Sequence, residues 1–282
     1  MASMEQPIRL NPQATRLGLG WAQSWTQGPI LCVVSPEAIR FSVASERRFI
    51  ASWEWSEETD SPHRFFLLPP FIASTLASPA AYHIVGLRAR TNRTHVVLTV
   101  RDEHGEYVLQ WRWQASAFQA PPFFEQMIHP PGETPQETYI AVADAVHLAI
   151  ANLGRLEAME QVERQNLAIA VDFAPGRFRI DGQPITLGDD QQYYFDPRLI
   201  VRGLEIVRGK HIGFSLARTP TSEQAILYMT SQRDQWRIQC AILSILPDEK
   251  THVISQQVRS LAQTGSLRVR ERPSSDGGEQ PA

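Results

Sequence analysis

The chain has 282 residues, of which 43% are hydrophobic and 20% are charged, and its formal net charge is −3. This length allows two domains with separate cores, and the composition is that of a soluble globular protein. No apolar run approaches the ~20 residues that a membrane-spanning helix needs, and the weak negative charge excludes a protein that is basic over its whole surface.

Two features of the sequence bear on the cellular compartment. The segment from Met1 to Leu10 carries no hydrophobic signal sequence, so we expect a cytoplasmic protein. The two cysteines, Cys32 and Cys240, each lie in an apolar, strand-like run. We therefore predict two buried free thiols, because disulfides are rare in a reducing compartment.

Residues 1–116 predict a first domain with two helices and several strands. A helix is expected from Pro12 to Trp25, because Asn11 is a favourable N-cap and proline suits the first helical turn. A second, short helix is expected from Pro70 to Ala77. Alternating apolar residues between turn signals predict strands over residues 30–34, 39–43, 49–55, 82–89, 95–101 and 106–113.

Residues 117–137 predict an interdomain linker. Its prolines, at positions 121, 122, 130, 131 and 135, disfavour both helix and central strand. The same segment carries several large apolar residues, so it is too apolar for a free tether. We expect it to lie pinned across the surface of the protein.

Residues 138–250 predict a second domain with the same plan. One helix is expected after Tyr139 and another from Pro197 to Val207. Strands are expected over residues 167–173, 177–180, 211–217, 225–230 and 235–246. The remaining residues, 251–282, predict a short helix and then a disordered tail, because proline, serine, glycine and glutamate dominate the end of the chain.

A repeat relates the two predicted domains. Each contains an aromatic, extended run and then a proline that opens a short amphipathic helix. The two prolines, Pro69 and Pro197, lie 128 residues apart, and the same offset relates Leu76 to Leu204. A duplication of this size predicts two similar domains, so function is expected to arise from how they combine.

Three stretches resemble the DNA sliding clamps, the polymerase processivity factors that close into a ring around duplex DNA. Residues 194–204 (YFDPRLIVRGL) resemble the strand that leads into an inner helix, and residues 236–246 resemble the closing C-terminal strand. Residues 117–123, with 138–140, resemble the linker and the entry to the next domain in bacterial clamps. The resemblance implies an α+β DNA clamp fold of two tandem clamp-type domains, each with two helices packed on antiparallel sheets.

The chain departs from the bacterial clamp in domain number and in its last strand. A bacterial clamp has three domains and closes its ring as a dimer, whereas this chain has room for two domains. A ring of six domains then implies a homotrimer. The last strand ends in residues 243–247 (LSILP), where bacterial clamps commonly end in a Met-Pro-x-Arg-type sequence.

The resemblance implies mobile, sequence-independent contacts between basic side chains and the phosphates of double-stranded DNA. The helix from Pro197 fits this role, because its apolar residues occupy one face while Arg198 and Arg202 occupy the other. We expect both arginines to be dispensable for thermal stability. Cations at the C-terminal end of the helix have an alternative role, which is to offset the helix dipole. The candidate DNA contacts are Arg16, Arg155, Arg198, Arg202, Arg208 and Lys210.

The resemblance also implies a groove beside the linker, in which short peptide motifs of replication or repair proteins dock through apolar side chains. The candidate residues for its lining are Phe118, Pro122, Phe123, Met127, Ile245 and Leu246. The alternative is that these residues only fasten the linker to the sheets.

Three classes of function are compatible with these observations. The favoured one is a ring that encircles DNA and tethers other proteins. The second is a clamp-fold scaffold that does not encircle DNA, since candidate lumen cations are few and residues 121–250 carry 17 acidic against 12 basic residues. The third is an enzyme, but the sequence contains no Gly-rich phosphate loop, no Cys-x-x-Cys motif and no pair of histidines at metal-ligand spacing. We therefore expect no catalytic residue, no metal and no cofactor.

Overall fold

The computed structural model describes most of the N-terminal half of the chain and the C-terminal strands. The described residues are 7–45, 47–59, 63–92, 94–128, 138–141, 169–174, 177–181, 193–208, 211–219 and 224–246. The helix expected after Tyr139 and the helix and tail expected over residues 251–282 lie outside them.

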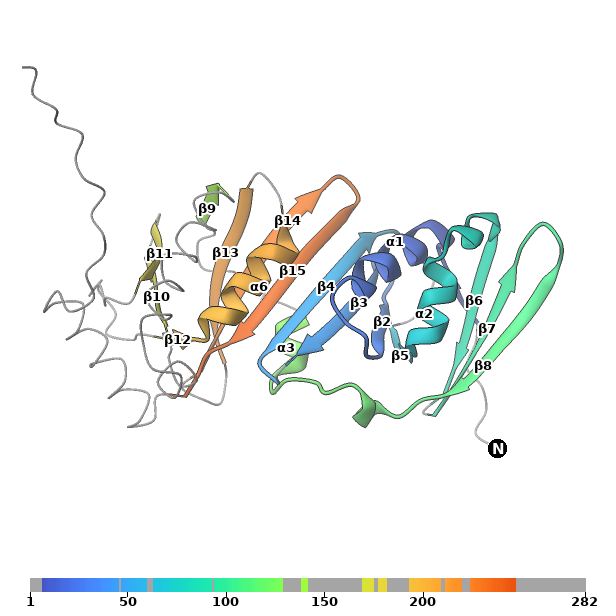
Figure 1. Ribbon diagram of the computed structural model, residues 1–282, viewed down its shortest axis with the longest axis horizontal. Helices are drawn as coiled ribbons and strands as arrows, with labels where there is room; N and C mark the ends of the chain where they lie inside the picture. The colour runs from blue at the N-terminus through green and yellow to red at the C-terminus, as the bar shows by residue number, and fades with distance from the viewer. Residues whose placement is uncertain are drawn as a thin grey trace, which may run out of the picture.

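Strands β1 to β8 and helices α1 and α2 form the N-terminal domain (Figure 1). In chain order they are β1 (Ile8–Leu10), α1 (Pro12–Gln23), β2 (Ile30–Val34), β3 (Ala38–Ser45), β4 (Phe49–Ser56), β5 (Arg64–Leu68), α2 (Pro70–Ala77), the 3₁₀ helix η1 (Pro79–His83), β6 (Gly86–Thr91), β7 (His95–Arg101) and β8 (Glu106–Arg112). The strand predicted over residues 82–89 begins later than expected. Pro79 opens η1, which is closed by a 3.0 Å bond from the Ala81 N–H to the Ser78 carbonyl, and this turn occupies the start of the predicted strand.

Two short helices lie at and in the linker: η2 (Ala115–Ala117) ends where the linker begins, and α3 (Phe124–Ile128) lies within it. The linker was expected to disfavour helix because of its prolines, but α3 forms between the prolines at positions 122 and 130. The described elements of the C-terminal domain are β9 (Thr138–Ala141), β10 (Ile169–Ala174), β11 (Arg177–Asp181), β12 (Tyr193–Phe195), α6 (Pro197–Val207), β13 (His211–Arg218), β14 (Ala225–Arg233) and β15 (Trp236–Leu243).

The order of the strands repeats between the two domains. One sheet of the N-terminal domain has the order β1-β6-β7-β8, and the corresponding strands of the C-terminal domain follow the order β9-β13-β14-β15. The order β5-β2-β3 likewise recurs as β12-β10-β11. The duplication predicted from the sequence is therefore present in the topology, and the fold is α+β with antiparallel sheets.

A single ladder joins the two domains. Strand β4 pairs antiparallel with β15 over the register from Trp55–Trp236 to Phe49–Ile242, which fuses two four-stranded sheets into one of eight strands. We call this β4–β15 ladder the seam. Figure 1 shows the fused sheet running across the middle of the molecule, with α1 and α6 both in front of it. Helix α1 packs on β3 and β4, and α6 packs on β14 and β15.

The helices that cover the seam approach the sheet closely because each has a glycine at the contact. In α1, a Cβ atom on Gly18 would overlap the rings of Phe41 and Trp53. In α6, a Cβ atom on Gly203 would overlap the side chain of Met229. Both glycines are the seventh residue of a helix that begins with proline, so the two domains use the same device to bring backbone against sheet.

Both cysteines are buried free thiols, as the sequence predicts. Cys32 on β2 and Cys240 on β15 have no exposed surface and form no disulfide. Burial raises the pKa of both thiols above the ordinary value, although the positive charge of Arg202 partly opposes this for Cys240. Each thiol acts as a small apolar side chain of the core.

The two glycines of α1 are expected to respond in opposite ways to a methyl group. Gly18→Ala should destabilise the protein by about 1–3 kcal/mol, because the aromatic rings beneath it cannot move without strain. Gly20→Ala should stabilise it by about 0.5–1 kcal/mol, since Gly20 is exposed, nothing lies near its Cβ position and alanine is the better helix former. Urea unfolding of both variants measures the difference, and equal effects would mean that α1 does not press on the sheet at Gly18.

Candidate nucleic-acid interface and linker groove

Helices α1, α2 and α6 gather on one side of the sheets (Figure 1). Helices α1 and α2 pack against each other, while α1 and α6 contact the same face of the seam. We call this side the helix face. It is the place where the sequence-predicted DNA contacts on these helices are found.

Arg198 lies on the helix face in the first turn of α6. Its side chain is 62% exposed, and its guanidinium pairs with the Asp196 carboxylate, at 2.5 Å for Nη2 and 3.1 Å for Nε. Asp196 is also the N-cap of the helix, accepting a 2.9 Å bond from the Arg198 backbone N–H. The Arg198 side chain is therefore accessible, but a neighbouring carboxylate offsets its charge.

Arg202 lies one turn further along α6 and reaches across the seam into the N-terminal domain. Its Nη1 donates to the Ser45 hydroxyl at 2.8 Å, and its Nη2 donates to the Trp25 carbonyl at 3.1 Å. Its guanidinium carbon lies 5.4 Å from the centre of the Phe49 ring. These bonds differ from the sequence-based expectation that Arg202 is dispensable for stability, because the side chain ties α6 to the other domain.

The other predicted DNA contacts are more dispersed. Arg208, exposed at the end of α6, lies 5.9 Å from the Trp25 ring, so it extends over the same boundary as Arg202. Arg16 on α1 is half-buried, with its guanidinium 3.4 Å from the centre of the Tyr82 ring. Arg155 and Lys210 lie outside the described residues.

The opposite side of the seam carries a partly buried polar row. Arg40 on β3, Glu54 on β4 and Arg237 on β15 lie side by side, with Arg40 and Arg237 both paired to the Glu54 carboxylate. Next to this row, the Ser42 and Ser52 hydroxyls share a 2.8 Å hydrogen bond. Polar side chains are costly to bury unless they are hydrogen-bonded, so a segment that covers this face must supply hydrogen-bond partners.

Helix α3 of the linker provides that cover. Arg40 Nη1 donates to the Ile128 carbonyl at 2.8 Å, Gln239 Nε2 to the Met127 carbonyl at 3.0 Å, and the Tyr228 hydroxyl to the Gln126 carbonyl at 2.7 Å. These donors come from β3, β14 and β15, on both sides of the seam. The linker is therefore pinned to both domains, as its apolar composition predicts.

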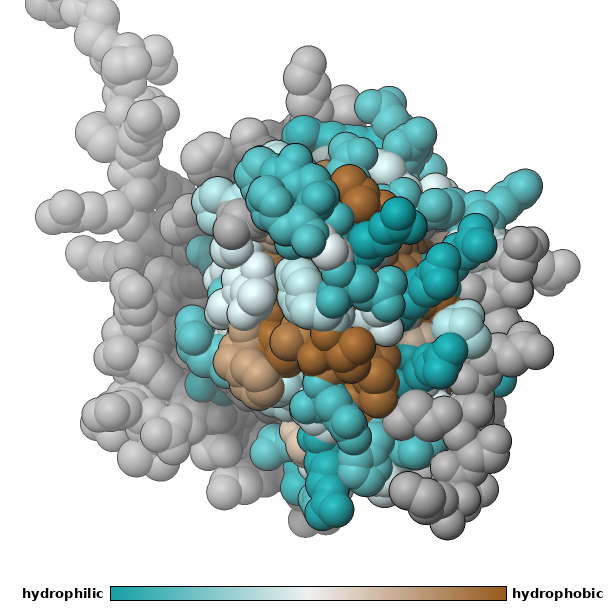
Figure 2. Space-filling model, turned by 90° about the vertical axis from the view of Figure 1, so that its right-hand side faces the viewer, coloured by the Kyte–Doolittle hydropathy of each residue, from teal (hydrophilic) through white to brown (hydrophobic). Residues whose placement is uncertain are grey.

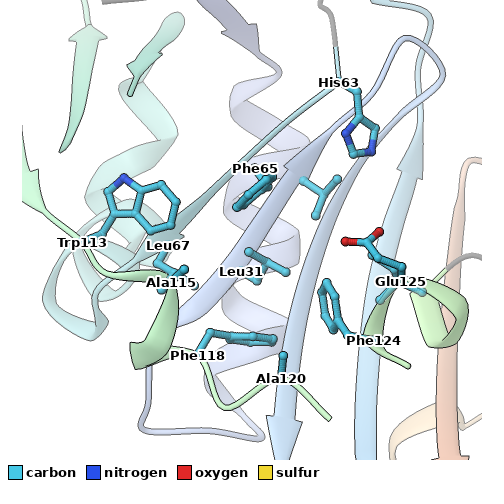
Figure 3. Close-up of a pocket in the computed structure, with 12 residues that line it drawn as sticks. Leu31, His63, Phe65, Leu67, Trp113, Ala115, Phe118, Ala120, Phe124 and Glu125 are labelled. Atoms are coloured by element: carbon cyan, nitrogen blue, oxygen red, sulfur yellow. The ribbon is translucent and has the colours of Figure 1, made fainter. Parts of the chain in front are cut away.

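An apolar groove lies on the same side of the sheet, between strands β2 and β5 and the linker (Figure 3). We call it the linker groove, and its volume is about 190 Å³. Figure 3 shows aromatic side chains around it and, at one end, the polar side chains of His63 and Glu125. Its main apolar lining residues are Leu31, Phe65, Leu67, Trp113, Phe118, Phe124 and Ile128.

The aromatic rings of the groove are fixed by edge-to-face contacts. Phe65 meets Trp113 at 5.9 Å between ring centres, and Phe118 meets Phe124 at 5.7 Å. Phe65 is nevertheless 53% exposed. Such an arrangement offers a preformed apolar surface, which is the usual character of a peptide or small-molecule site.

The predicted partner residues are distributed differently. Of these six, Phe118 lines the groove. Met127 is buried, with its backbone carbonyl bonded to Gln239, and Phe123 takes a positive φ of 60° at the turn into α3. Pro122, Ile245 and Leu246 are not among the described residues that line the groove. Sequence reasoning missed Phe65, Trp113 and Phe124, although period-2 alternation in residues 64–68 places Phe65 opposite the buried Phe66.

Two other classes of feature are absent from the described part of the chain. No group of three or more His, Cys, Asp or Glu residues within it is arranged to hold a metal ion. None of its helices is long and apolar enough to cross a membrane.

Comparison with known proteins gives matches in structure alone, since no family model and no curated protein matches the sequence. The DNA polymerase III beta subunit of Thermotoga maritima has a TM-score of 0.56 at 11% identity, over 88% of this chain and 67% of that chain. For the beta subunit of the Streptococcus pyogenes DNA polymerase the TM-score is 0.51 at 12% identity, over 87% and 67%. For the H. pylori beta clamp in complex with 5-chloroisatin it is 0.50 at 9% identity, over 88% and 68%.

These similarities extend over most of this chain and about two thirds of each clamp subunit, at identities that establish fold alone. The repeated strand order and the antiparallel sheets agree with the sequence-based expectation of two tandem clamp-type domains. The chain is a divergent clamp-fold protein, with two tandem domains that resemble those of the DNA polymerase III beta-subunit sliding clamps.

Proposed function

We propose that the chain assembles into a closed ring around duplex DNA and tethers replication or repair proteins through the linker groove. The observation that carries this proposal is the seam. Strand β15 closes the seam by pairing with β4, and β8 is the counterpart of β15 in the repeated strand order. Among the described strands, β8 pairs with β7 alone, so its other edge is available to a second copy of the chain.

The exposed edge of β8 has the character of an interface. Tyr107 and Val108 on β8 are 42% and 59% exposed. Figure 2 looks onto this end of the molecule and shows an apolar patch bordered by hydrophilic side chains. An exposed sheet edge beside apolar surface is a template for pairing with another chain. Three copies of a two-domain chain form a ring of six domains, so we propose a homotrimer.

Strand β8 allows a substitution that affects only its free edge. The Trp113 N–H donates to the Thr94 carbonyl of the neighbouring chain segment, so alternation along β8 directs the Val108 N–H away from β7. Val108→Pro should therefore remove an edge donor, convert the trimer to a monomer and leave the β7–β8 ladder intact. Sedimentation equilibrium measures the mass, with Val108→Thr, which keeps the N–H, as the matched control.

The ring itself is tested by the topology of the DNA. A closed ring slides off linear duplex but is retained on a covalently closed circle of the same sequence. Wild-type protein whose ring has closed around the circular DNA should remain bound until a nuclease cuts that DNA. Release at the same rate from circular and linear DNA would contradict encirclement. Continued peptide binding under that condition would favour the alternative function, a clamp-fold scaffold, which the carboxylate pairing of Arg198 and the interdomain bonds of Arg202 support.

The two arginines of α6 are expected to separate DNA contact from stability. Arg198→Ala should lower the salt-dependent affinity for duplex DNA, while changing the free energy of unfolding by less than about 1 kcal/mol, because its ion pair is exposed. Arg202→Ala should destabilise the protein by about 1–3 kcal/mol, because it leaves the Ser45 hydroxyl and the Trp25 carbonyl unpaired. Urea unfolding and DNA titration of both variants decide this, and equal stabilities would remove Arg202 from the seam.

The linker groove is expected to bind peptides with large apolar side chains. Peptides selected from a displayed random library on the wild-type protein should lose about tenfold in affinity for Phe65→Glu, because a charge is then buried beneath the ligand. Phe71→Glu is the matched control, since Phe71 on α2 is 63% exposed and lies outside the groove. Fluorescence anisotropy measures both affinities. If Phe71→Glu weakens binding as much as Phe65→Glu, the peptides do not use this groove.

A further inference from the structure

A strongly basic surface lies on the outer side of the sheet β1-β6-β7-β8. In the sheet β1-β6-β7-β8, alternate side chains such as Ile8, Leu87 and Leu98 are buried in the core, so their neighbours in the sequence point to the opposite, solvent-facing side. We call that side the arginine face. Five exposed arginines occupy it: Arg9, Arg88, Arg90, Arg101 and Arg112. Among the residues of these four strands, Glu106 is the single acidic residue.

The strand register brings three of these arginines together. Arg9 on β1 lies directly opposite Arg88 on β6, and Arg88 lies opposite Thr99 on β7. Two residues further along β7 from Thr99, Arg101 lies opposite Gly86 on β6. Gly86 has no side chain, so the space between Arg88 and Arg101 stays open. A pocket of about 320 Å³ results, lined by these residues together with Glu106.

In the part of the chain that the structure describes, no arginine of the arginine face forms an ion pair, although Glu106 lies directly opposite Arg101. Arg40 and Arg198 each pair with a carboxylate. Within the described residues, Arg9, Arg88, Arg90 and Arg101 form no ion pair or hydrogen bond through their side chains. Like charges directly opposite each other on a sheet, such as Arg9 and Arg88, destabilise it. An anion bound between them relieves this repulsion, and the arginine fork is suited to phosphate oxygens.

The extent of the face indicates an elongated ligand. From Arg101 at one end to Arg112 at the other, the arginines span three steps of two residues along the sheet, or about 20 Å. This is too long for one small anion and suits a chain of phosphates. The side chains between them on β7 and β8 are Val97, Thr99, Val108 and Gln110. The His95 imidazole at the end of the row is hydrogen-bonded to Arg112, so the face is better suited to phosphates than to stacked bases.

We propose that the arginine face binds the phosphodiester backbone of a nucleic-acid strand that lies outside the ring, without regard to base sequence. This site is separate from the helix face and does not depend on ring closure. Edge-to-edge pairing of β8 with another copy takes place in the plane of the sheet, so it leaves Arg9, Arg88 and Arg101 accessible. The protein would then hold two nucleic-acid segments, one inside the ring and one on its outer surface.

Small closed nucleic acids test this proposal, because they have no end to thread through a closed ring. The probes are a circular single strand of about 30 nucleotides and a duplex of similar length closed by a hairpin at each end. Binding to the full-length protein is followed by fluorescence anisotropy over a range of salt concentrations. The two probes distinguish single-stranded from double-stranded backbone as the preferred ligand.

The expected result is that Arg88→Glu with Arg101→Glu weakens binding of at least one closed probe by about tenfold or more. The salt slope should also fall by roughly 1.4 for the single strand or 1.8 for the duplex, as expected for two lost phosphate contacts. Arg233→Glu is the matched control, because it reverses an exposed charge on the β14–β15 hairpin and should have little effect. Thermal midpoints of all variants confirm folding.

Three outcomes would overturn the proposal. The first is that wild-type protein binds neither closed probe at low salt. The second is that Arg198→Glu, and not the double variant, abolishes binding, which would assign the closed probes to the helix face. The third is that a polyglutamate peptide binds the arginine face more tightly than either probe, which would identify an acidic protein as the ligand. None of these outcomes bears on retention of circular DNA by the ring.

Discussion

The fold depends on the seam, the antiparallel ladder between β4 and β15. Without this ladder the molecule would consist of two domains connected by a linker, each with an exposed sheet edge. With it, one sheet of eight strands crosses the domain boundary, and both of its faces are stabilised across that boundary. On the helix face, Arg202 of α6 bonds to Ser45 and to the Trp25 carbonyl. On the other face, α3 accepts hydrogen bonds from strands of both domains.

The seam also explains why the linker is part of the structure. The row of Arg40, Glu54 and Arg237 lies across three strands, and its carboxylate is only 15% exposed. Buried ion pairs are stable only when further hydrogen bonds satisfy their remaining polar atoms. The Ile128 carbonyl supplies one such bond to Arg40. Because α3 is fixed by this chemistry, the wall that it gives to the adjacent linker groove is ordered in advance, and the ligand that we propose for this groove would not have to order the linker first.

Local features were predictable from the sequence, whereas contacts between distant segments were not. The N-caps Asn11 and Asp196, the proline-led helices and the duplicated strand pattern all follow from short-range signals. Helical periodicity placed Arg202 on the polar face of α6, but no local signal shows that β15 pairs with β4, more than 180 residues earlier. The linker groove was predicted only through Phe118, because Phe65 reaches it from β5 and Trp113 from the residue after β8, which belong to two different sheets.

The distribution of arginine gives different roles to the two sides of the N-terminal domain. On the helix face, Arg16 packs on the ring of Tyr82. Arg202 of the C-terminal domain donates a hydrogen bond to Ser45 of the N-terminal domain. These guanidinium groups therefore serve the fold as well as any ligand, and they carry less free charge than the sequence implies. On the arginine face, Arg9 and Arg88 are exposed and adjacent, and their mutual repulsion is not offset by a carboxylate partner within the described structure. A net charge of −3 conceals this asymmetry, because electrostatic attraction of a ligand depends on the local field and not on the total charge.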